Sequence, residues 1–337
     1  MIQEAIQELV DGRSLPMEQA AQVMTEIMDG EATPAQFGAF VTALRLKGET
    51  PDEIAGMAQV MREKSLHVEI DGPLVDTCGT GGDASGSFNI STTAGFVVAG
   101  AGVKVAKHGN RAMSSACGSA DVLEALGVKI DLSPDAVRRC LEEVGFGFMF
   151  AQRYHPSMRF AAGPRREIGI RTVFNILGPL TNPAGAKANL LGVADAGVAE
   201  TMAQVLGRLG SEHALIVHGK DGLDEITLGD ETQVWEMKDG SVSTYTLSPE
   251  DLGFNRARRG DLTAGTVEDS KRMLREVLEG GAGPTRNVVL MNAAAALVAA
   301  DRVASLKEGV ALASKSIDSG AAQKTLDALI ALSNGLE

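Results

Sequence analysis

The fold of this chain is decided by LVDTCGTGGDASGSFNISTTAGFVVAGAGVKVAKHG, residues 74–109. Two short runs rich in apolar and β-branched residues, 74–79 and 103–109, flank an apolar segment of helical character at 94–101. A strand, a helix and a second strand in this order form the unit from which parallel sheets are assembled. The stretch therefore predicts an α/β protein with a mainly parallel central sheet.

The same alternation continues toward the C-terminus. HALIVHG (213–219) follows a helical pattern at 199–209, and a further apolar stretch occupies 288–302. In 232–247, by contrast, two alternating runs flank an Asp-Gly pair, which predicts an antiparallel hairpin. We therefore expect one large α/β domain covering residues 71–337.

The start of the chain has only helical signals. TPAQ (33–36) and TPDE (50–53) each offer a hydroxyl N-cap, a proline at the first helical position and a glutamine or glutamate at the third. We expect a small all-helical domain at 1–70, joined by a helical segment near 163–185.

Composition narrows the classes of protein. The 337 residues include 31 basic and 44 acidic side chains, a net charge of −13, whereas a protein that grips nucleic acid by its phosphates usually has a basic surplus. The three cysteines form no CxxC pair, which indicates a reducing compartment with neither structural disulfides nor zinc. The N-terminus lacks the pattern of a signal peptide, and no apolar run is long enough to cross a bilayer. We expect a cytoplasmic protein that binds neither nucleic acid nor membrane.

A glycine-rich loop, DTCGTGGD (76–83), follows the first apolar run. It contains Gly79, Gly81 and Gly82, and the lack of side chains lets successive backbone N–H groups turn toward one anion. It matches neither a Walker sequence nor the GxGxxG dinucleotide fingerprint. Taken alone, the loop is explained equally well as a tight turn without a ligand.

The segment after this loop strengthens the case for phosphate. FNISTT (88–93) leads into the apolar helix, so Ser91 and Thr92 lie where free N–H groups and the positive end of the helix dipole favour an anion. The same hydroxyls could cap the helix, and the two roles can coexist. Two anion-seeking features so close together predict a phosphate site.

A third polar segment, 107–127, reads KHGNRAMSSACGSADVLEALG. We expect the preceding strand to end at Lys107, which places His108, Asn110 and Arg111 at the carboxyl edge of the sheet, where open α/β folds bind ligands. A surface loop with scattered charges is the alternative, but its polar residues would have no reason to cluster directly after a buried strand.

The chain resembles the anthranilate phosphoribosyltransferases, which contain in the same order DTCGTGGD, FNIST, KHGNRAMSSACGSADVLEALG and RREIGIRTVFNILGPLTNPA (165–184). The resemblance implies a fold of the nucleoside phosphorylase/phosphoribosyltransferase type, with a cleft between the helical and α/β domains. It implies transfer of 5-phosphoribose from phosphoribosyl pyrophosphate to the amine of anthranilate, giving N-(5-phosphoribosyl)anthranilate and pyrophosphate. This reaction is the second step of tryptophan biosynthesis from chorismate. The resemblance also implies Mg²⁺ as the cofactor and a homodimer formed through the helical domain.

The resemblance assigns a set of residues in these motifs to phosphoribosyl pyrophosphate. They are Gly79, Gly82, Asp83, Ser87, Asn89, Ile90, Ser91, Thr92, Lys107, His108, Gly109, Asn110, Arg111, Ala112, Met113, Ser114, Ser115 and Ser119. Ser87 stands where the family usually has threonine, a change that keeps the hydroxyl.

The metal and the second substrate are assigned to other residues. Asp224 and Glu225 are adjacent carboxylates whose spacing alone favours an ordinary acidic turn, but the resemblance implies that they and Ser91 bind Mg²⁺. The implied anthranilate site contains Gly79, Asn110 and Arg165, with His108, His155 and Arg171 nearby. A guanidinium suits the carboxylate of anthranilate because its fork donates two parallel hydrogen bonds. No residue is assigned as a general base.

Other functions fit parts of the sequence. A pyrimidine nucleoside phosphorylase resembles this family in architecture and in its glycine-rich loop. Its reaction involves no magnesium-bound diphosphate, so the segments GNRAMSS and DGLDE argue against this class of enzyme. A relative that has lost transferase activity and binds nucleic acid is disfavoured by the charge of −13 and by the complete motifs. Cys78 and Cys117 lie inside the motifs, but they have no spaced His or Asp partner, so we expect them to be packing residues rather than nucleophiles.

Overall fold

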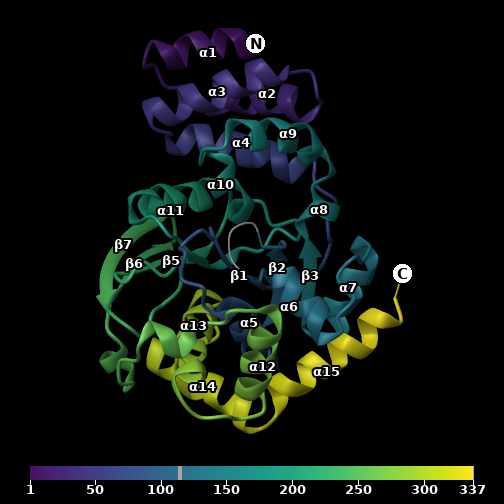
Figure 1. The fold of residues 1–337 in the computed structure, drawn as a ribbon, viewed down its shortest axis with the longest axis vertical. Helices are drawn as coiled ribbons and strands as arrows, with labels where there is room; N and C mark the ends of the chain where they lie inside the picture. The colour runs from purple at the N-terminus through teal and green to yellow at the C-terminus, as the bar shows by residue number, and fades with distance from the viewer. Residues whose placement is uncertain (113–115, 337) are drawn as a thin grey trace.

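The computed structural model describes residues 1–112 and 116–336. Figure 1 shows a small helical body stacked on a larger α/β body. The helical body begins with α1 (Ile2–Val10), α2 (Met17–Met28), α3 (Pro34–Lys47) and α4 (Pro51–Glu63).

Helices α3 and α4 begin at the predicted caps. The Thr33 hydroxyl accepts a hydrogen bond from the backbone of Gln36, and the Thr50 hydroxyl accepts one from the backbone of Glu53. Each box is completed by the glutamine or glutamate side chain, which accepts from the N–H of its cap residue. The buried Glu53 carboxylate also accepts from the backbone of Leu15 at 2.9 Å, so this cap ties α4 to the chain before α2.

The larger body is built on a seven-stranded sheet with the order β3-β2-β1-β4-β5-β6-β7. Its strands are β1 (Leu74–Gly79), β2 (Lys104–Gly109), β3 (Phe146–Phe150), β4 (Ala188–Gly192), β5 (His213–Gly219), β6 (Thr232–Lys238) and β7 (Ser241–Leu247). Strands β1 to β5 pair in parallel, and β6 and β7 form the predicted antiparallel hairpin. Asp239 and Gly240, with φ of 50° and 75°, make its turn. The expected fold class is confirmed.

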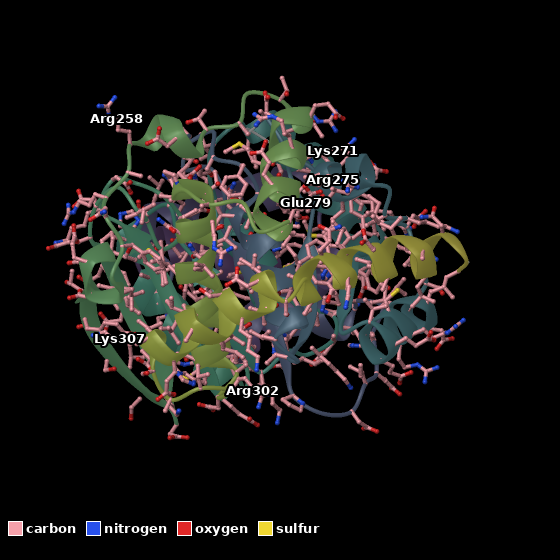
Figure 2. The ribbon with its side chains drawn as sticks, turned by 90° about the horizontal axis from the view of Figure 1, so that it is seen from below. Arg258, Lys271, Arg275, Glu279, Arg302 and Lys307 are labelled. Atoms are coloured by element: carbon pink, nitrogen blue, oxygen red, sulfur yellow. The ribbon has the colours of Figure 1, made fainter. Side chains whose placement is uncertain are left out.

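Helices surround this sheet. They are α5 (Ile90–Gly100), α6 (Ser119–Leu126), α7 (Pro134–Glu143), α8 (Ala151–Tyr154), α9 (Arg159–Ile168), α10 (Phe174–Leu177), α11 (Ala199–Arg208), α12 (Val267–Leu278), α13 (Pro284–Ala299), α14 (Leu306–Asp318) and α15 (Ala321–Asn334). Helices α5 and α13 pack on the sheet and on each other, and α14 and α15 pack on α5. Figure 2 shows this layer from below, with Lys271 and Arg275 on α12 and Glu279 directly after its end. None of the described helices is long and apolar enough to span a membrane.

The sequence left one detail open, and one prediction differs from the structure. The apolar stretch 288–302, which the sequence alone assigned to neither a helix nor a strand, forms most of α13, and its run of alanines has a high helix propensity. Strand β2 extends beyond Lys107 to Gly109, since residues 105–109 pair with β3. His108 therefore belongs to the strand and not to the loop that follows it.

The core of the helical body is shared with the sheet. One buried cluster contains apolar side chains of α2, α3 and α4, residues between Ala161 and Leu180, and the face of the sheet that α11 covers. Helix α9 packs against α2 and α3, so α9 and α10 occupy the segment expected near 163–185. The domain division at residue 70 remains a prediction.

Candidate active site

A cleft of about 610 Å³ lies at the carboxyl ends of the parallel strands, facing the segment that carries α9 and α10. Its wall includes these predicted residues: Gly79, Gly82, Asp83, Ser87, Asn89, Ile90, Ser91, Lys107, His108, Gly109, Asn110, Arg111, Ala112, Ser119, Arg165, Arg171, Asp224 and Glu225. Thr92 and His155 do not line the cleft, and Met113, Ser114 and Ser115 lie outside the described residues.

The glycine-rich loop crosses the floor of this cleft. Gly81 and Gly82 have φ of 65° and 76°, a backbone conformation that residues with a Cβ rarely adopt. The N–H of Gly81 donates to the Asp224 carboxylate at 2.8 Å. From the opposite wall, a guanidinium nitrogen of Arg171 donates to the carbonyl of Gly82 at 3.4 Å. The loop is therefore in contact with both sides of the cleft.

Two paired glycines make room for Asp224. Gly79 at the end of β1 lies opposite Gly192 at the end of β4. A Cβ on Gly192 would overlap the carbonyl oxygen of Asp224, and a Cβ on Gly79 would come within 2.6 Å of its carboxylate. The sequence prediction did not include Gly192. In the sequence, Gly192 is marked only by its position at the end of a short apolar run.

The carboxylates of Asp224 and Glu225 are partly buried and close to that of Asp83. Burial, reinforced by the negative charge of Asp83, raises the pKa of Asp224 to about 7. Burial and the charge of Asp224 raise the pKa of Glu225 to about 8, while Lys107 opposes this shift. A cation would relieve the repulsion between these carboxylates. One buried oxygen of Asp83 has no hydrogen-bond partner within the part of the chain that the structure describes.

This donor set fits Mg²⁺. Within the described ranges no three His, Cys, Asp or Glu side chains converge as a complete metal cage. Mg²⁺ commonly binds through one or two carboxylates and fills its remaining positions with water and substrate phosphates. The backbone N–H of Ser91 donates to the Glu225 carboxylate at 3.1 Å, which places Ser91 next to the carboxylates. Its hydroxyl can therefore supply a neutral oxygen ligand.

Lys107 supplies a buried positive charge at the cleft floor. Its side chain is almost fully buried, and its ammonium donates to the carbonyl of Thr77 and to the hydroxyl of Ser91, the latter at 3.3 Å. Burial lowers the pKa of Lys107, and the carboxylate of Asp76 acts in the opposite direction. The hydroxyl of Thr92, one residue further, is buried without a partner and does not reach the cleft wall.

Asn89 is held by a residue outside the motifs. Its backbone N–H donates to the hydroxyl of Ser270 at 3.0 Å, and that hydroxyl donates to the Asn89 side-chain oxygen at 2.6 Å. The Asn89 amide then donates to the carbonyl of Cys117 at 3.3 Å. Ser270 is fully buried on α12, and no pattern in the sequence singles it out.

Arg111 lines the cleft, but its guanidinium is bound to α6. It donates to Asp121 at 3.1 Å and to Glu124 at 2.9 Å, and it lies over the ring of Phe150. Asp121 also accepts from the backbones of Ala112 and Gly118 at 2.9 Å each. The charge of Arg111 is therefore largely compensated by α6, unlike that of Lys107, Arg165 and Arg171, which also line the cleft.

Arg165 lines the wall opposite the glycine-rich loop, and His108 lines the cleft at the end of β2. The guanidinium of Arg165 lies 5.4 Å from the centroid of the Phe174 ring, and both side chains line the cleft. The Nδ1–H of His108 donates to the carbonyl of Gly178 at 3.2 Å, and its buried Nε2 has no hydrogen-bond partner among the described residues. Burial and the neighbouring His155 lower the pKa of His108 to about 3, so it is a neutral side chain. The centroids of the two histidine rings are 5.0 Å apart.

The burial of His155 predicts a pH effect on stability. Burial lowers its pKa to about 4 from an ordinary value of 6.5, so the unfolded chain takes up a proton that the folded chain excludes. Its contribution is constant above about pH 6.5 and becomes increasingly destabilising as the pH falls toward 4. When the pH falls from 7 to 5, the free energy of unfolding should decrease in the wild type. In His155→Gln this decrease should be smaller by about 2 kcal/mol, because the protonation of His155 no longer contributes to it.

Urea unfolding curves at the two pH values measure this difference, and any pH-independent effect of the substitution cancels. The exposed His67→Gln serves as the control. Equal pH dependence in wild type and His155→Gln would contradict a buried neutral His155.

Neither cysteine in the cleft resembles a nucleophile. Cys78 and Cys117 line the wall and are largely buried. Burial raises the pKa of Cys78 well above its ordinary value and that of Cys117 to about 11. Both thiols are therefore protonated at neutral pH, which agrees with a packing role.

Known proteins share this fold and sequence. The family model for the helical bundle domain of a glycosyl transferase family matches residues 3–65, and the model for its a/b domain matches 71–323. The anthranilate phosphoribosyltransferase of Moorella thermoacetica is 57% identical over 332 residues, covering 98% of both chains. That of Chloroflexus aurantiacus is 58% identical over 336 residues, covering 99% of both.

Solved structures agree with these relatives. The anthranilate phosphoribosyltransferase of Thermus thermophilus superposes with a TM-score of 0.93 at 46% identity, covering 98% of this chain and 99% of its own. The Saccharomyces cerevisiae enzyme, in a complex with phosphoribosyl pyrophosphate and Mg, gives a TM-score of 0.91 at 28% identity, covering 99% and 98%. The chain therefore belongs to the anthranilate phosphoribosyltransferase family.

Proposed function

We propose that this protein transfers 5-phosphoribose from phosphoribosyl pyrophosphate to the amine of anthranilate, releasing pyrophosphate, as the second step of tryptophan biosynthesis. The observation that carries this proposal is the convergence in one cleft of a glycine-rich anion loop, a carboxylate pair and an arginine opposite them. Relatives of known activity add support, because they match over nearly the whole chain.

The phosphoribosyl pyrophosphate lies along the floor of the cleft in this proposal. Backbone N–H groups of the glycine-rich loop donate to its phosphates, and the positive end of the α5 dipole favours the same negative charge. The Lys107 ammonium lies close enough to Ser91 to stabilise negative charge that develops on the leaving diphosphate. The hydroxyl of Ser270 donates to the side-chain oxygen of Asn89 and so fixes the orientation in which the Asn89 amide faces the substrate.

Asp224, Glu225 and the hydroxyl of Ser91 are the residues that would hold Mg²⁺. When bound, the ion neutralises charge on the diphosphate and makes it a better leaving group. The chain contributes by fixing the carboxylates: the N–H of Gly81 orients Asp224, and the N–H of Ser91 orients Glu225.

Anthranilate binds, in this proposal, between Arg165 and the end of β2. The Arg165 guanidinium receives the carboxylate, and the ring lies near Gly79 and Asn110. An aromatic amine is uncharged at neutral pH, so attack needs its lone pair aimed at the anomeric carbon more than it needs a strong base. The neutral His108, with a free Nε2, suits the uncharged part of the substrate. Approach of the two bodies would exclude water from the forming bond.

The direct test follows the fluorescence of anthranilate with phosphoribosyl pyrophosphate and Mg²⁺. We expect a loss of signal that requires all three components. A constant signal under saturating conditions would refute the proposed reaction. Phosphate-dependent cleavage of thymidine would instead identify a nucleoside phosphorylase.

Arg165→Ala should raise the KM for anthranilate roughly tenfold to a hundredfold, the effect of losing hydrogen bonds to a charged group. The KM for phosphoribosyl pyrophosphate should stay within about twofold of wild type, because the diphosphate contacts lie on the other wall. Arg166→Ala is the matched control, since that side chain is exposed and does not line the cleft. An unchanged anthranilate KM in steady-state kinetics would remove Arg165 from the site.

We also propose that the protein acts in the cytoplasm as a homodimer that associates through its helical domain. The strongly exposed apolar side chains include Val10, at 67% exposure, and Leu46, at 84%, both on this body. Apolar groups of this kind are more stable when a second copy covers them.

A further inference from the structure

One polar side chain lies in the middle of an apolar, buried helix. Helix α13 is buried from Val288 to Leu297, and Asn292 is the polar residue within that run, with a side chain that is 0% exposed. A buried amide costs free energy unless its polar atoms are hydrogen-bonded. The presence of asparagine at this position therefore needs a specific partner to explain it.

That partner is the backbone of Ile226. The Asn292 oxygen accepts from the Ile226 N–H at 3.0 Å, and its nitrogen donates to the Ile226 carbonyl at 2.9 Å. The same nitrogen donates to the carbonyl of Val288, one turn earlier in α13, at 2.9 Å. One side chain thus engages both backbone groups of Ile226, as a neighbouring strand would.

Ile226 directly follows Glu225. The segment from Gly222 to Glu231 belongs to no helix or strand, so the hydrogen bonds of regular structure do not fix it. Asn292 supplies hydrogen bonds to the backbone of Ile226 from α13, and both residues are fully buried. The amide is therefore placed one residue away from the carboxylate that the cleft requires.

The loop needs such an anchor because it holds like charges together. Asp83, Asp224 and Glu225 line the same cleft, and repulsion between carboxylates held so close together favours their separation. The bonds from Gly81 and Ser91 orient the carboxylates from the cleft side only. Asn292 holds the chain on the opposite side, so its loss would let the carboxylates separate.

We propose that Asn292 is a positioning residue for the metal site, and that its buried amide fixes Ile226 so that Asp224 and Glu225 face the bound diphosphate together. This inference rests on the proposed function. A residue that only stabilised the fold would change the melting temperature when replaced. A positioning residue should also change the affinity of the protein for the metal.

The experiment measures Mn²⁺ bound to the protein by water-proton relaxation, with phosphoribosyl pyrophosphate present. Mn²⁺ takes the same oxygen ligands as Mg²⁺ and is visible by this method. Asn292→Leu keeps the side-chain size and removes all three hydrogen bonds. We expect it to weaken Mn²⁺ binding by about tenfold to a hundredfold, as for other residues that support metal ligands. Glu225→Gln should show a comparable loss.

Asn189→Leu is the matched control. Asn189 is also a buried asparagine, and its amide donates to Ser211 at 3.1 Å near the amino end of β4. Both variants lose a buried hydrogen bond and should melt at lower temperature than wild type, but Asn189→Leu should bind Mn²⁺ as wild type does. In kinetics, Asn292→Leu should need more Mg²⁺ for half-maximal activity, and a high concentration should recover much of the rate.

The outcomes separate the possibilities. Wild-type Mn²⁺ affinity in a folded Asn292→Leu would overturn the proposal and leave Asn292 a packing residue. If that variant does not fold, Asn292→Ser, which is smaller and keeps one polar group, decides: a loss of at least threefold supports the proposal, and wild-type affinity overturns it. If the wild type itself binds no Mn²⁺, the metal role of Asp224 and Glu225 fails, and the inference about Asn292 fails with it.

Discussion

Replacing Asp224 with Asn and Glu225 with Gln in one variant should reduce magnesium-supported turnover by about a thousandfold or more. The amides keep the size of both side chains but remove the negative charges that would hold Mg²⁺ against the diphosphate. Loss of a single preorganised electrostatic contact typically costs ~100- to 1,000-fold in rate, and this variant loses two carboxylates together. Raising the Mg²⁺ concentration should restore little, because too few oxygen ligands of suitable charge remain.

The same loop offers a control for this variant. Asp230→Asn with Glu231→Gln makes the same two chemical changes in adjacent residues, but these carboxylates pair with Arg256 and Lys220 and do not line the cleft. That control should retain wild-type kinetics. Near-normal turnover of the Asp224/Glu225 variant across a Mg²⁺ titration would show that the metal, if needed, is held elsewhere.

The second large effect is expected for Lys107→Met. Methionine keeps much of the length and the apolar stem, so the change removes the ammonium that contacts Thr77 and Ser91. We expect kcat to fall by roughly 100- to 1,000-fold, since a buried charge next to the leaving group acts in surroundings where electrostatic interactions are strong. Steady-state rates at saturating substrates measure the effect.

The neighbouring lysine on the same strand is the matched control for Lys107→Met. Lys104 lies at the other end of β2, where its ammonium donates to the carbonyl of Asp71 at 3.2 Å, away from the cleft. Lys104→Met should leave the kinetics unchanged. Circular dichroism and melting curves of both variants establish that they fold. A folded Lys107→Met with a kcat within threefold of wild type would exclude Lys107 from the chemistry.

Much of the fold could be predicted because local signals agreed with the final structure. The caps at Thr33 and Thr50, the strand-helix-strand unit and the Asp239-Gly240 turn are short-range features, and the structure contains each of them. The structure of the stretch 288–302 could not be assigned from its pattern, because an apolar run alone does not distinguish a buried strand from a buried helix. Its alanines were the signal that could have decided the question.

The motifs of the site were predictable for the same reason, since most of them follow strand ends at the carboxyl edge of the sheet. The residues that hold them were not. The residues Gly192, Ser270 and Asn292 act through neighbours that are distant along the chain. Gly192 and Asn292 meet the loop after β5, and Ser270 meets Asn89 just before α5. Each is an ordinary residue in its own segment, so only the tertiary structure reveals its partner. The pairing of Arg111 with α6 is likewise invisible in the order of residues.

The shared core of the helical body has a consequence for synthesis of the chain. Helices α1 to α4 end at Glu63, but Ala161 and Phe174, which complete their buried cluster, follow on the order of a hundred residues later. A ribosome adding ~5–20 residues per second needs roughly 5–20 s to make that intervening stretch. During this interval the apolar side chains of α1 to α4 can pack on one another, but those that contact residues 161–180, such as Phe37 against Phe174, remain uncovered. The first part of the protein to leave the ribosome is thus among the last to complete its core.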